Sequence, residues 1–155
     1  MAGEIGNQAR RPPLRRLALV VFGLLIIGAV VTISRGVPAA VAPGEQIALG
    51  ERIYAANCAA CHGPSAEGEY PDAPQQPGPD GLFGAPPHDE TGHTWHHPDD
   101  LLWQIIRDGS SVEGFKEMPA FGTALTDEEI EAVLAYIKTL WTDEQRDIQA
   151  EMSQQ

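Results

Sequence analysis

Residues 58–63 read Cys58-Ala59-Ala60-Cys61-His62-Gly63. Two cysteines separated by two residues and followed at once by histidine form the C-x-x-C-H attachment site of c-type haem. On a helical turn this spacing sets the two thiols to add across the two vinyl groups of the porphyrin. The adjacent imidazole is then held beside the iron as its proximal ligand. The stretch therefore predicts one covalent haem c, attached through Cys58 and Cys61 and ligated by His62.

Two other classes of site use the same residue types. A zinc site would need two more soft ligands near by, whereas Cys58 and Cys61 are the only cysteines in the chain. A thioredoxin-like dithiol is expected within a strand–helix–strand pattern, which the surrounding sequence lacks. Neither alternative explains the stretch as completely as haem attachment does.

Composition and charge describe a small acidic domain with an appendage. The 155 residues include 13 prolines, 16 glycines and only 6% aromatic residues, so a bound porphyrin would supply much of the core. Residues 1–35 have a net charge of +4, whereas residues 36–155 carry five cations against 21 acids, a net charge of −16. This charge argues against nucleic acid as a partner and favours a redox partner with a basic docking surface. Acidity that serves solubility alone is the alternative.

An apolar run near the N-terminus predicts a membrane anchor. Residues 17–33 are uncharged and would span about 25 Å as a helix. Arg15 and Arg16 precede the run, which predicts a cytoplasmic tail at residues 1–16, a transmembrane anchor at 17–35 and a domain on the outer, periplasmic face of a bacterial cytoplasmic membrane. A cleaved signal peptide, cut after Ala42, is the alternative, but Pro43 and the length of the run favour an anchor.

Helical periodicity and turn residues divide the rest of the chain. A linker at residues 36–44 leads to a helix over about 45–56, which ends at the cysteine motif. Residues 63–89 contain seven prolines and are expected to form a loop. An irregular loop of this length is unusual in a compact domain unless it wraps a ligand.

Two further helices are expected towards the C-terminus. Pro98 is predicted in the first turn of a helix that ends at Gly109, and residues 110–125 form a second loop. The capping box Thr126–Glu129 opens a helix at residues 127–140. A second box at Thr142 begins a polar helical extension over residues 142–155.

The order of these motifs resembles the class I monohaem cytochromes c, of a membrane-anchored bacterial type. The resemblance implies a cytochrome c domain at residues 45–141. It implies an all-α fold of three to five helices wrapped around one covalent haem, besides the N-terminal transmembrane helix. The first and last helices of the domain should cross near Gly50 and Tyr136. Besides the cysteine motif, the residues that carry the resemblance are Gly50, Ile53, Tyr54, Met118, Pro119 and Val133–Ile137.

Met118 is the predicted sixth ligand of the iron. It lies 56 residues after His62, in the loop before the last helix of the domain, where the family places its axial methionine. A thioether ligand favours ferrous iron and raises the reduction potential. Alternatives are that Met118 fills core space, or that a histidine replaces it. The four candidate histidines, which could also hold a copper or zinc ion together, are His88, His93, His96 and His97. In a further alternative, His93, His96 and His97 form hydrogen bonds with the haem propionates or cap the helix at Pro98.

Other residues are expected around the haem. Tyr54 and Trp95 are predicted to contact the porphyrin. In the family, a proline carbonyl accepts a hydrogen bond from the second ring nitrogen of the proximal histidine. Pro79, Pro86 and Pro87 are candidates for this role, and the sequence does not separate them.

These expectations together predict an electron carrier rather than an enzyme. An iron with six ligands leaves no open site for a substrate. The predicted function is single-electron transfer by a membrane-tethered, His/Met-ligated c-type cytochrome. Its predicted partners are redox proteins or a membrane oxidoreductase complex. The alternatives are a haem enzyme or sensor with a labile or open sixth site, and a histidine-rich module that handles metal ions.

Overall fold

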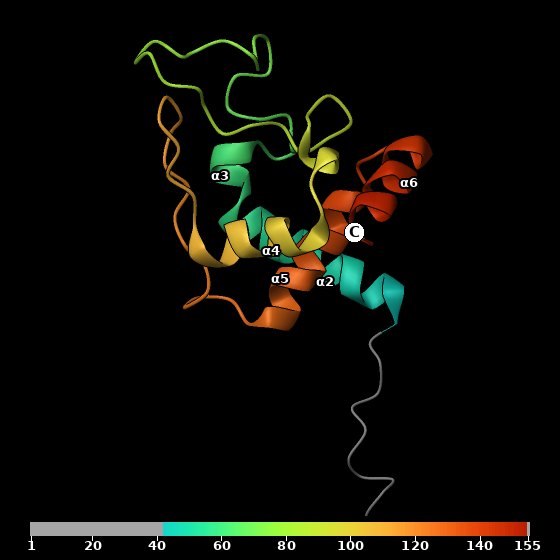
Figure 1. Cartoon of the computed structure of the whole chain (residues 1–155). Helices are drawn as coiled ribbons and strands as arrows, with labels where there is room; N and C mark the ends of the chain where they lie inside the picture. The colour runs from blue at the N-terminus through green and yellow to red at the C-terminus, as the bar shows by residue number, and fades with distance from the viewer. Residues whose placement is uncertain (1–41, 155) are drawn as a thin grey trace, which may run out of the picture. The chain divides into compact units, whose positions relative to one another are not determined.

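The computed structural model describes residues 42–154, and Figure 1 shows how their helices are arranged. The predicted cytoplasmic tail, the transmembrane anchor and most of the linker lie outside the described residues. Between residues 42 and 154, no helix combines the length and the apolar character that crossing a membrane requires. These residues contain helices and two isolated β-bridges but no strand, so the all-α prediction is confirmed for this part of the chain.

The first described helix, α2 (Pro43–Asn57), ends at the cysteine motif as predicted. It begins two residues earlier than expected, because Pro43 occupies its first turn, where a missing N–H costs no hydrogen bond. The chain leaves the helix at Cys58 and immediately forms the short helix α3 (Ala59–His62). The whole cysteine motif therefore lies on a helical turn.

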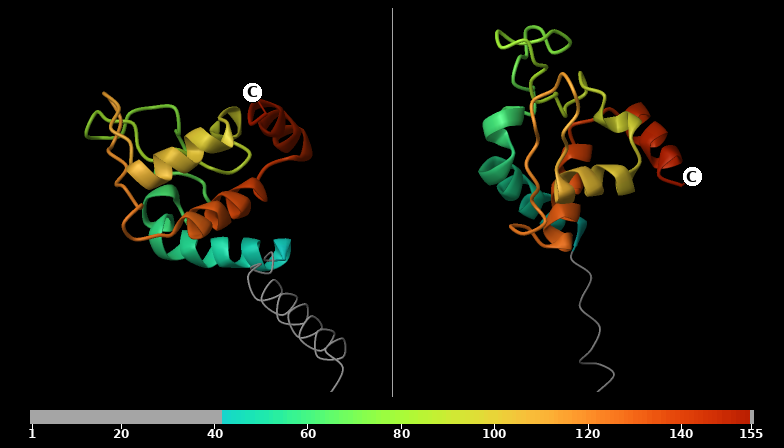
Figure 2. Two further views of the ribbon diagram at one scale, coloured as in Figure 1. Left: turned by 60° about the horizontal axis from the view of Figure 1, so that its bottom comes forward. Right: turned by 60° about the vertical axis from the view of Figure 1, so that its left-hand side comes forward.

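Helix α5 (Asp127–Lys138) crosses α2, as the two views of Figure 2 show. The contact depends on Gly50, where an added Cβ would lie 1.9 Å from the carbonyl oxygen of Ala132 and 2.9 Å from the Cβ of Tyr136. The ring centroids of Tyr54 and Tyr136 are 5.4 Å apart at the same crossing. The predicted crossing near Gly50 and Tyr136 is therefore confirmed.

The two ends of α5 have different local causes. Its N-terminus has the predicted capping box, in which Thr126 accepts from the Glu129 N–H and Glu129 accepts from the Thr126 N–H. Its C-terminus comes two residues before the predicted end at residue 140. The N–H groups of Thr139 and Leu140 donate to carbonyls three residues back rather than four. The last turn is therefore tighter than an α-helix, and the α-helix ends before it.

Helix α4 (Asp99–Asp108) packs against α5 through Leu102 and Ile106. Pro98 stands just outside the helix, at the N-cap, rather than in the first turn as predicted. Gly109 ends the helix with φ +77°, a conformation that favours glycine. A Cβ at Gly109 would lie 2.7 Å from the Met118 carbonyl oxygen, so glycine also lets the Met118 segment approach the helix end.

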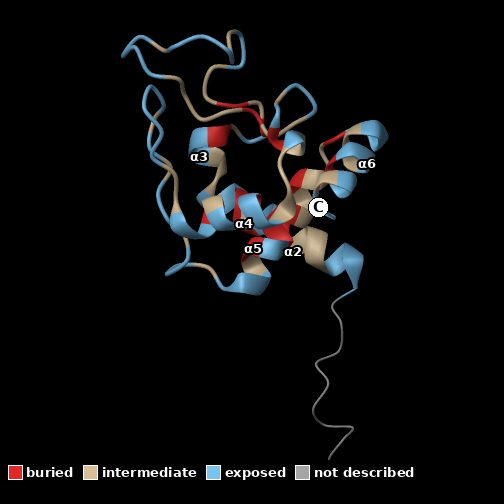
Figure 3. Cartoon of the chain, viewed as in Figure 1, coloured by how far each residue is buried: buried red, intermediate tan, exposed pale blue. Residues whose placement is uncertain are grey.

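The core lies where α2, α4 and α5 meet, and Figure 3 shows its buried residues in red. Trp141 extends it to the end of the predicted cytochrome domain. Its buried hydrophobic residues are Ile53, Tyr54, Ala66, Leu102, Ile106, Ile130, Ala132, Val133, Leu134, Ile137 and Trp141.

Two long loops pair with each other on the α3 side of the domain (Figure 1). The Phe83 N–H donates to the Gly114 carbonyl, and the Lys116 N–H donates to the Phe83 carbonyl. The rings of Phe83 and Phe115 stack at 5.0 Å between centroids. The predicted loops at residues 63–89 and 110–125 contain no α-helix.

The C-terminal extension is a helix, α6 (Asp143–Met152), with the predicted capping box at Thr142. The extension was predicted as a polar helix, and its sequence gives no sign of a packing face. In the structure it packs against the short 3₁₀ helix η1 (Thr94–His96), and Gln149 is 2% exposed.

Candidate functional site

The cysteine motif presents its three reactive groups from one turn. Cys58 stands at the break between α2 and α3 and is half-buried, whereas Cys61 is exposed and His62 is buried. Both cysteines are free thiols in the structure. Burial raises the pKa of Cys58 to about 11, so its sulfur is a neutral thiol at pH 7. Tyr54 lies one turn before and donates from its hydroxyl to the Gly63 carbonyl, 3.0 Å away, which ties the end of α3 to α2.

The His62 ring is held in one tautomer. Its Nδ1 lies 2.9 Å from the Pro86 carbonyl oxygen, which can only accept, so Nδ1 carries the proton and Nε2 the lone pair. Burial lowers the pKa of His62, against the opposing effect of this hydrogen bond. The imidazole is therefore neutral at pH 7, the form that binds a metal ion.

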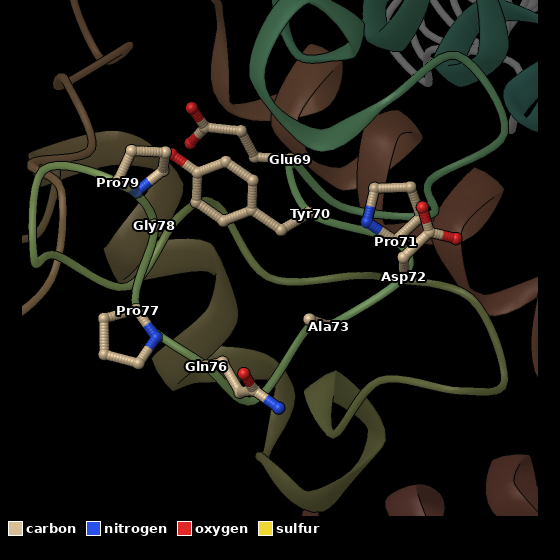
Figure 4. A pocket seen from close by; sticks show the side chains of 9 residues that line it. All are labelled: Glu69, Tyr70, Pro71, Asp72, Ala73, Gln76, Pro77, Gly78 and Pro79. Atoms are coloured by element: carbon tan, nitrogen blue, oxygen red, sulfur yellow. The ribbon is translucent and has the colours of Figure 1, made fainter.

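The three candidate prolines occupy different places. The Pro86 carbonyl bonds His62. The buried Pro87 instead accepts from the Thr94 hydroxyl at 3.5 Å, so its carbonyl supports the neighbouring segment. Pro79 is exposed and lines an open pocket of about 380 Å³ in the loop (Figure 4).

His88, predicted above as a candidate metal ligand, lies against His62. The rings of His62 and His88 stack with centroids 4.1 Å apart and planes 26° apart. Burial and the nearby His62 hold the pKa of His88 well below its usual value. The Nδ1 of His88 lies 2.8 Å from the Thr94 hydroxyl. The sequence could not predict this contact, because the residues between His62 and His88 form a loop without periodicity.

Met118 lies in the second loop and packs against the buried core. Its backbone exchanges two hydrogen bonds with Ser110, of 2.9 and 3.0 Å. These bonds fix the Met118 backbone to the segment that follows α4. Pro119 follows directly and restricts the backbone. The side chain is half-buried.

Trp95 and the other histidines make mostly local contacts. Trp95 packs against the core, donates from its indole N–H to the Gly92 carbonyl, and lies 3.6 Å from the His96 ring between centroids. The rings of His93 and His97 meet edge to face at 5.5 Å. The N-cap of α4 makes no side-chain hydrogen bond, and the Asp99 N–H donates to the Ser153 hydroxyl, so the alternative that a histidine caps the helix is wrong. Among residues 42–154 no group of three or more His, Cys, Asp or Glu side chains is arranged to hold a metal ion.

Lys116 ties the loop around Tyr70 to the Met118 loop. Its Nζ lies 2.5 Å from a Glu69 carboxylate oxygen, 2.9 Å from the Tyr70 hydroxyl and 3.4 Å from Asp80. Figure 4 shows the Tyr70 ring beside Glu69 and the chain at Gly78. A Cβ at Gly78 would lie 2.3 Å from the Tyr70 hydroxyl, so the ring packs directly on the backbone.

The donor set fits a covalently bound haem c. Cys58 and Cys61 supply two thiols from one helical turn, and His62 supplies a neutral imidazole whose Nδ1 is already bonded. Met118 offers a thioether from a fixed loop.

A comparison with protein families agrees with this chemistry. The model of the family described as cytochrome C oxidase, cbb3-type, subunit III matches residues 45–137. No curated protein matches the chain.

Proposed function

The chain belongs to the cytochrome c oxidase, cbb3-type, subunit III family, and on this basis we propose that it is a single-electron carrier whose haem iron is ligated by His62 and Met118. The family binds haem c, so the predictions of a class I monohaem c-type cytochrome and of its cofactor are confirmed. When bound, the haem supplies a one-electron couple between ferric and ferrous iron.

The observation that carries the proposal is the His62 ring and its acceptor. The Pro86 carbonyl fixes the tautomer, burial keeps the imidazole neutral, and Cys58 and Cys61 lie on the same turn. A ring nitrogen bonded in this way is oriented and made more basic, which is the usual arrangement behind a metal-ligating histidine. These contacts support His62 as the proximal ligand.

Met118 is proposed as the distal ligand. The paired backbone of Ser110 and Met118 holds the thioether in a defined place, next to the buried core. Among residues 42–154 the other methionine is Met152, which lies in α6. If His62 and Met118 both held the haem iron, the protein's task would be to hold the haem, set its potential and exclude substrates from the iron.

The acidic surface is proposed as the docking determinant. Four of the five cations of the domain lie next to an acidic side chain, so they neutralise acids of the same molecule rather than attract a partner; they are Arg107, Lys116, Lys138 and Arg146. A partner with a basic surface would approach this field faster than a neutral one. The family name describes a subunit of an oxidase, so we propose a membrane oxidoreductase complex as the setting.

The proposed location is the outer face of a bacterial cytoplasmic membrane, with residues 17–35 as the anchor. Support comes from the 17-residue uncharged run and the arginines before it. Extraction of native membranes in mild detergent, followed by N-terminal sequencing, tests this. We expect a start at Met1 or Ala2. A start at Pro43 would show a cleaved, diffusible protein instead.

Acid-acetone extraction tests the attachment. Colour should stay with the polypeptide, because thioether bonds survive the acid, and Cys58→Ala should leave a single bond. Release of all the haem into the solvent would refute covalent attachment. The ferric spectrum of the native, untreated protein should be low-spin, whereas a high-spin spectrum would support an open sixth site and an enzyme or sensor.

A further inference from the structure

The contact between His88 and His62 is not explained by the proposed function. We propose that His88 is a positioning residue which fixes the ring plane of His62, and that the C-terminal extension holds His88 in place through Trp141. This inference rests on the proposed role of His62 as the proximal ligand. It assigns a task to residues 141–153, which lie beyond the family match at residues 45–137.

The His62 ring has two contacts of different kinds. The hydrogen bond from Nδ1 to Pro86 fixes one end of the ring but leaves rotation about that bond. The stacked His88 ring, 4.1 Å away and tilted by 26°, restricts this rotation because a turned ring would collide with it. Together the two contacts define the plane as well as the direction of the imidazole.

His88 is itself held from three directions. Its backbone N–H donates to the Ala66 carbonyl at 2.8 Å, and its carbonyl accepts from the Trp141 indole N–H at 2.9 Å. Its ring Nδ1 lies 2.8 Å from the hydroxyl of the buried Thr94. That hydroxyl donates to the Pro87 carbonyl, which leaves its oxygen to accept from His88.

Trp141 connects this contact to the C-terminal extension. It is 3% exposed, joins the hydrophobic core, and stands directly before the capping box at Thr142. Arg146 of α6 donates back to the Trp141 carbonyl. The indole is therefore fixed by the core on one side and by the start of α6 on the other.

Helix α6 also clamps the segment that follows His88. The buried Gln149 donates to the His97 carbonyl at 3.3 Å and to the Asp99 carboxylate at 2.6 Å. Gln145 donates to the Glu90 carbonyl at 2.9 Å, and the Ser153 hydroxyl accepts from the Asp99 N–H at 3.1 Å. Residues 88–99 are thus hydrogen-bonded to residues 141–153 at both ends. A displacement of α6 would therefore shift the position of His88.

Substitutions in the haem-loaded protein test this. Trp141→Phe keeps an aromatic ring in the core but removes the N–H that bonds His88. Trp103→Phe is the matched control, because Trp103 is half-buried against the same core but lies on α4, beside Arg107. His88→Leu removes the stacked ring and replaces it with an apolar side chain of similar size. The measurements are haem content, the g-values of the ferric protein, the haem-methyl shifts in the NMR spectrum, and the reduction potential.

We expect Trp141→Phe and His88→Leu to keep covalent haem but to show changed g-values, displaced or doubled haem-methyl signals and a shifted potential. Trp103→Phe should match the wild type. Wild-type g-values and methyl shifts in both variants would overturn the inference, since they would show that α6 only stabilises the domain. If Trp141→Phe does not fold, His88→Leu decides alone. Loss of covalent haem from the wild type, or a His62→Ala protein with an unchanged spectrum, would instead contradict the proposed function.

Discussion

Met118 is the residue whose substitution most directly tests the ligand set. Met118→Ala should abolish the long-wavelength absorption band of sulfur-ligated ferric iron. It should also lower the reduction potential, because a thioether favours ferrous iron more than water or imidazole does. Met152→Ala, in α6, is the matched control and should change neither. Optical spectra and a redox titration of the two purified variants measure the effect.

The fold should survive Met118→Ala, because the haem stays attached through Cys58 and Cys61. A cavity in the half-buried core is expected to cost about 2–3 kcal/mol, at the lower part of the range for methionine. An unchanged spectrum and potential would mean that a histidine is the sixth ligand, and the high-potential carrier would have to be abandoned.

At the same scale, the sequence predicted His62 and its thiols but not the ring that lies against it. The C-x-x-C-H spacing is local, so it can be read directly from the chain. The choice of Pro86 over Pro79 or Pro87, and the stacking of His88 on His62, depend on the path of a loop with no periodicity. Such contacts follow from tertiary packing rather than from local propensity.

The crossing of α2 and α5 gives a prediction at the scale of whole elements. Gly50→Ala should destabilise the protein by about 1–3 kcal/mol, because the new methyl group would overlap the Ala132 carbonyl and force the helices apart. Gly44→Ala makes the same change in the same helix where nothing lies within 4 Å of the new Cβ. It should be neutral or slightly stabilising. Chemical denaturation of the two variants gives the comparison, and equal stabilities would show that the helices do not cross closely at Gly50.

Helices were easier to predict than the places where they end. Apolar stripes and the capping boxes at Thr126 and Thr142 located α5 and α6, since both signals lie within one or two turns. The end of α5 was placed two residues too far, because a tightened last turn leaves no mark on the apolar stripe. The docking of α6 was missed, because Gln149 is buried by hydrogen bonds rather than by apolar contact.

The ion pair between the two loops predicts a pH dependence. The hydrogen bond from Lys116 lowers the pKa of Glu69 below its usual value. The pair therefore stabilises the fold fully above the unfolded pKa of about 4.3, and this contribution is lost as the pH falls through the lower folded pKa. Lys116→Met should thus be less stable than the wild type near neutral pH, and the difference should shrink below about pH 4.

Denaturant titrations of wild type and Lys116→Met between about pH 3 and pH 7 measure this difference. Arg52→Met serves as the control, because Arg52 is exposed on α2 and has no ion pair among the described residues. The difference should be small in absolute terms, because both partners are partly solvated. A difference that stays constant across the pH range would show that Lys116 acts through its packing on Tyr70 instead.

The charge of the whole domain governs how fast small redox reagents reach it. The net charge of residues 36–155 is −16. Electron transfer with a cationic reagent such as hexaammineruthenium should slow as the salt rises from about 0.01 to 0.15 M, because the screening length falls from ~30 to ~8 Å. The reaction with anionic ferrocyanide should accelerate over the same range. Stopped-flow rates that do not depend on salt for either reagent would mean that the charge serves solubility alone.

The described domain has only five lysines and arginines, and this has a consequence for proteolysis. Trypsin cleaves after lysine and arginine in chain that has locally unfolded. Each of the five sites in the described domain lies in a helix or in an ion pair between loops: Arg52 in α2, Arg107 in α4, Lys138 in α5, Arg146 in α6, and Lys116 with Glu69. The native domain should therefore resist digestion. Once unfolded, it should release a single coloured fragment, Ile53–Arg107, because no lysine or arginine lies between these ends.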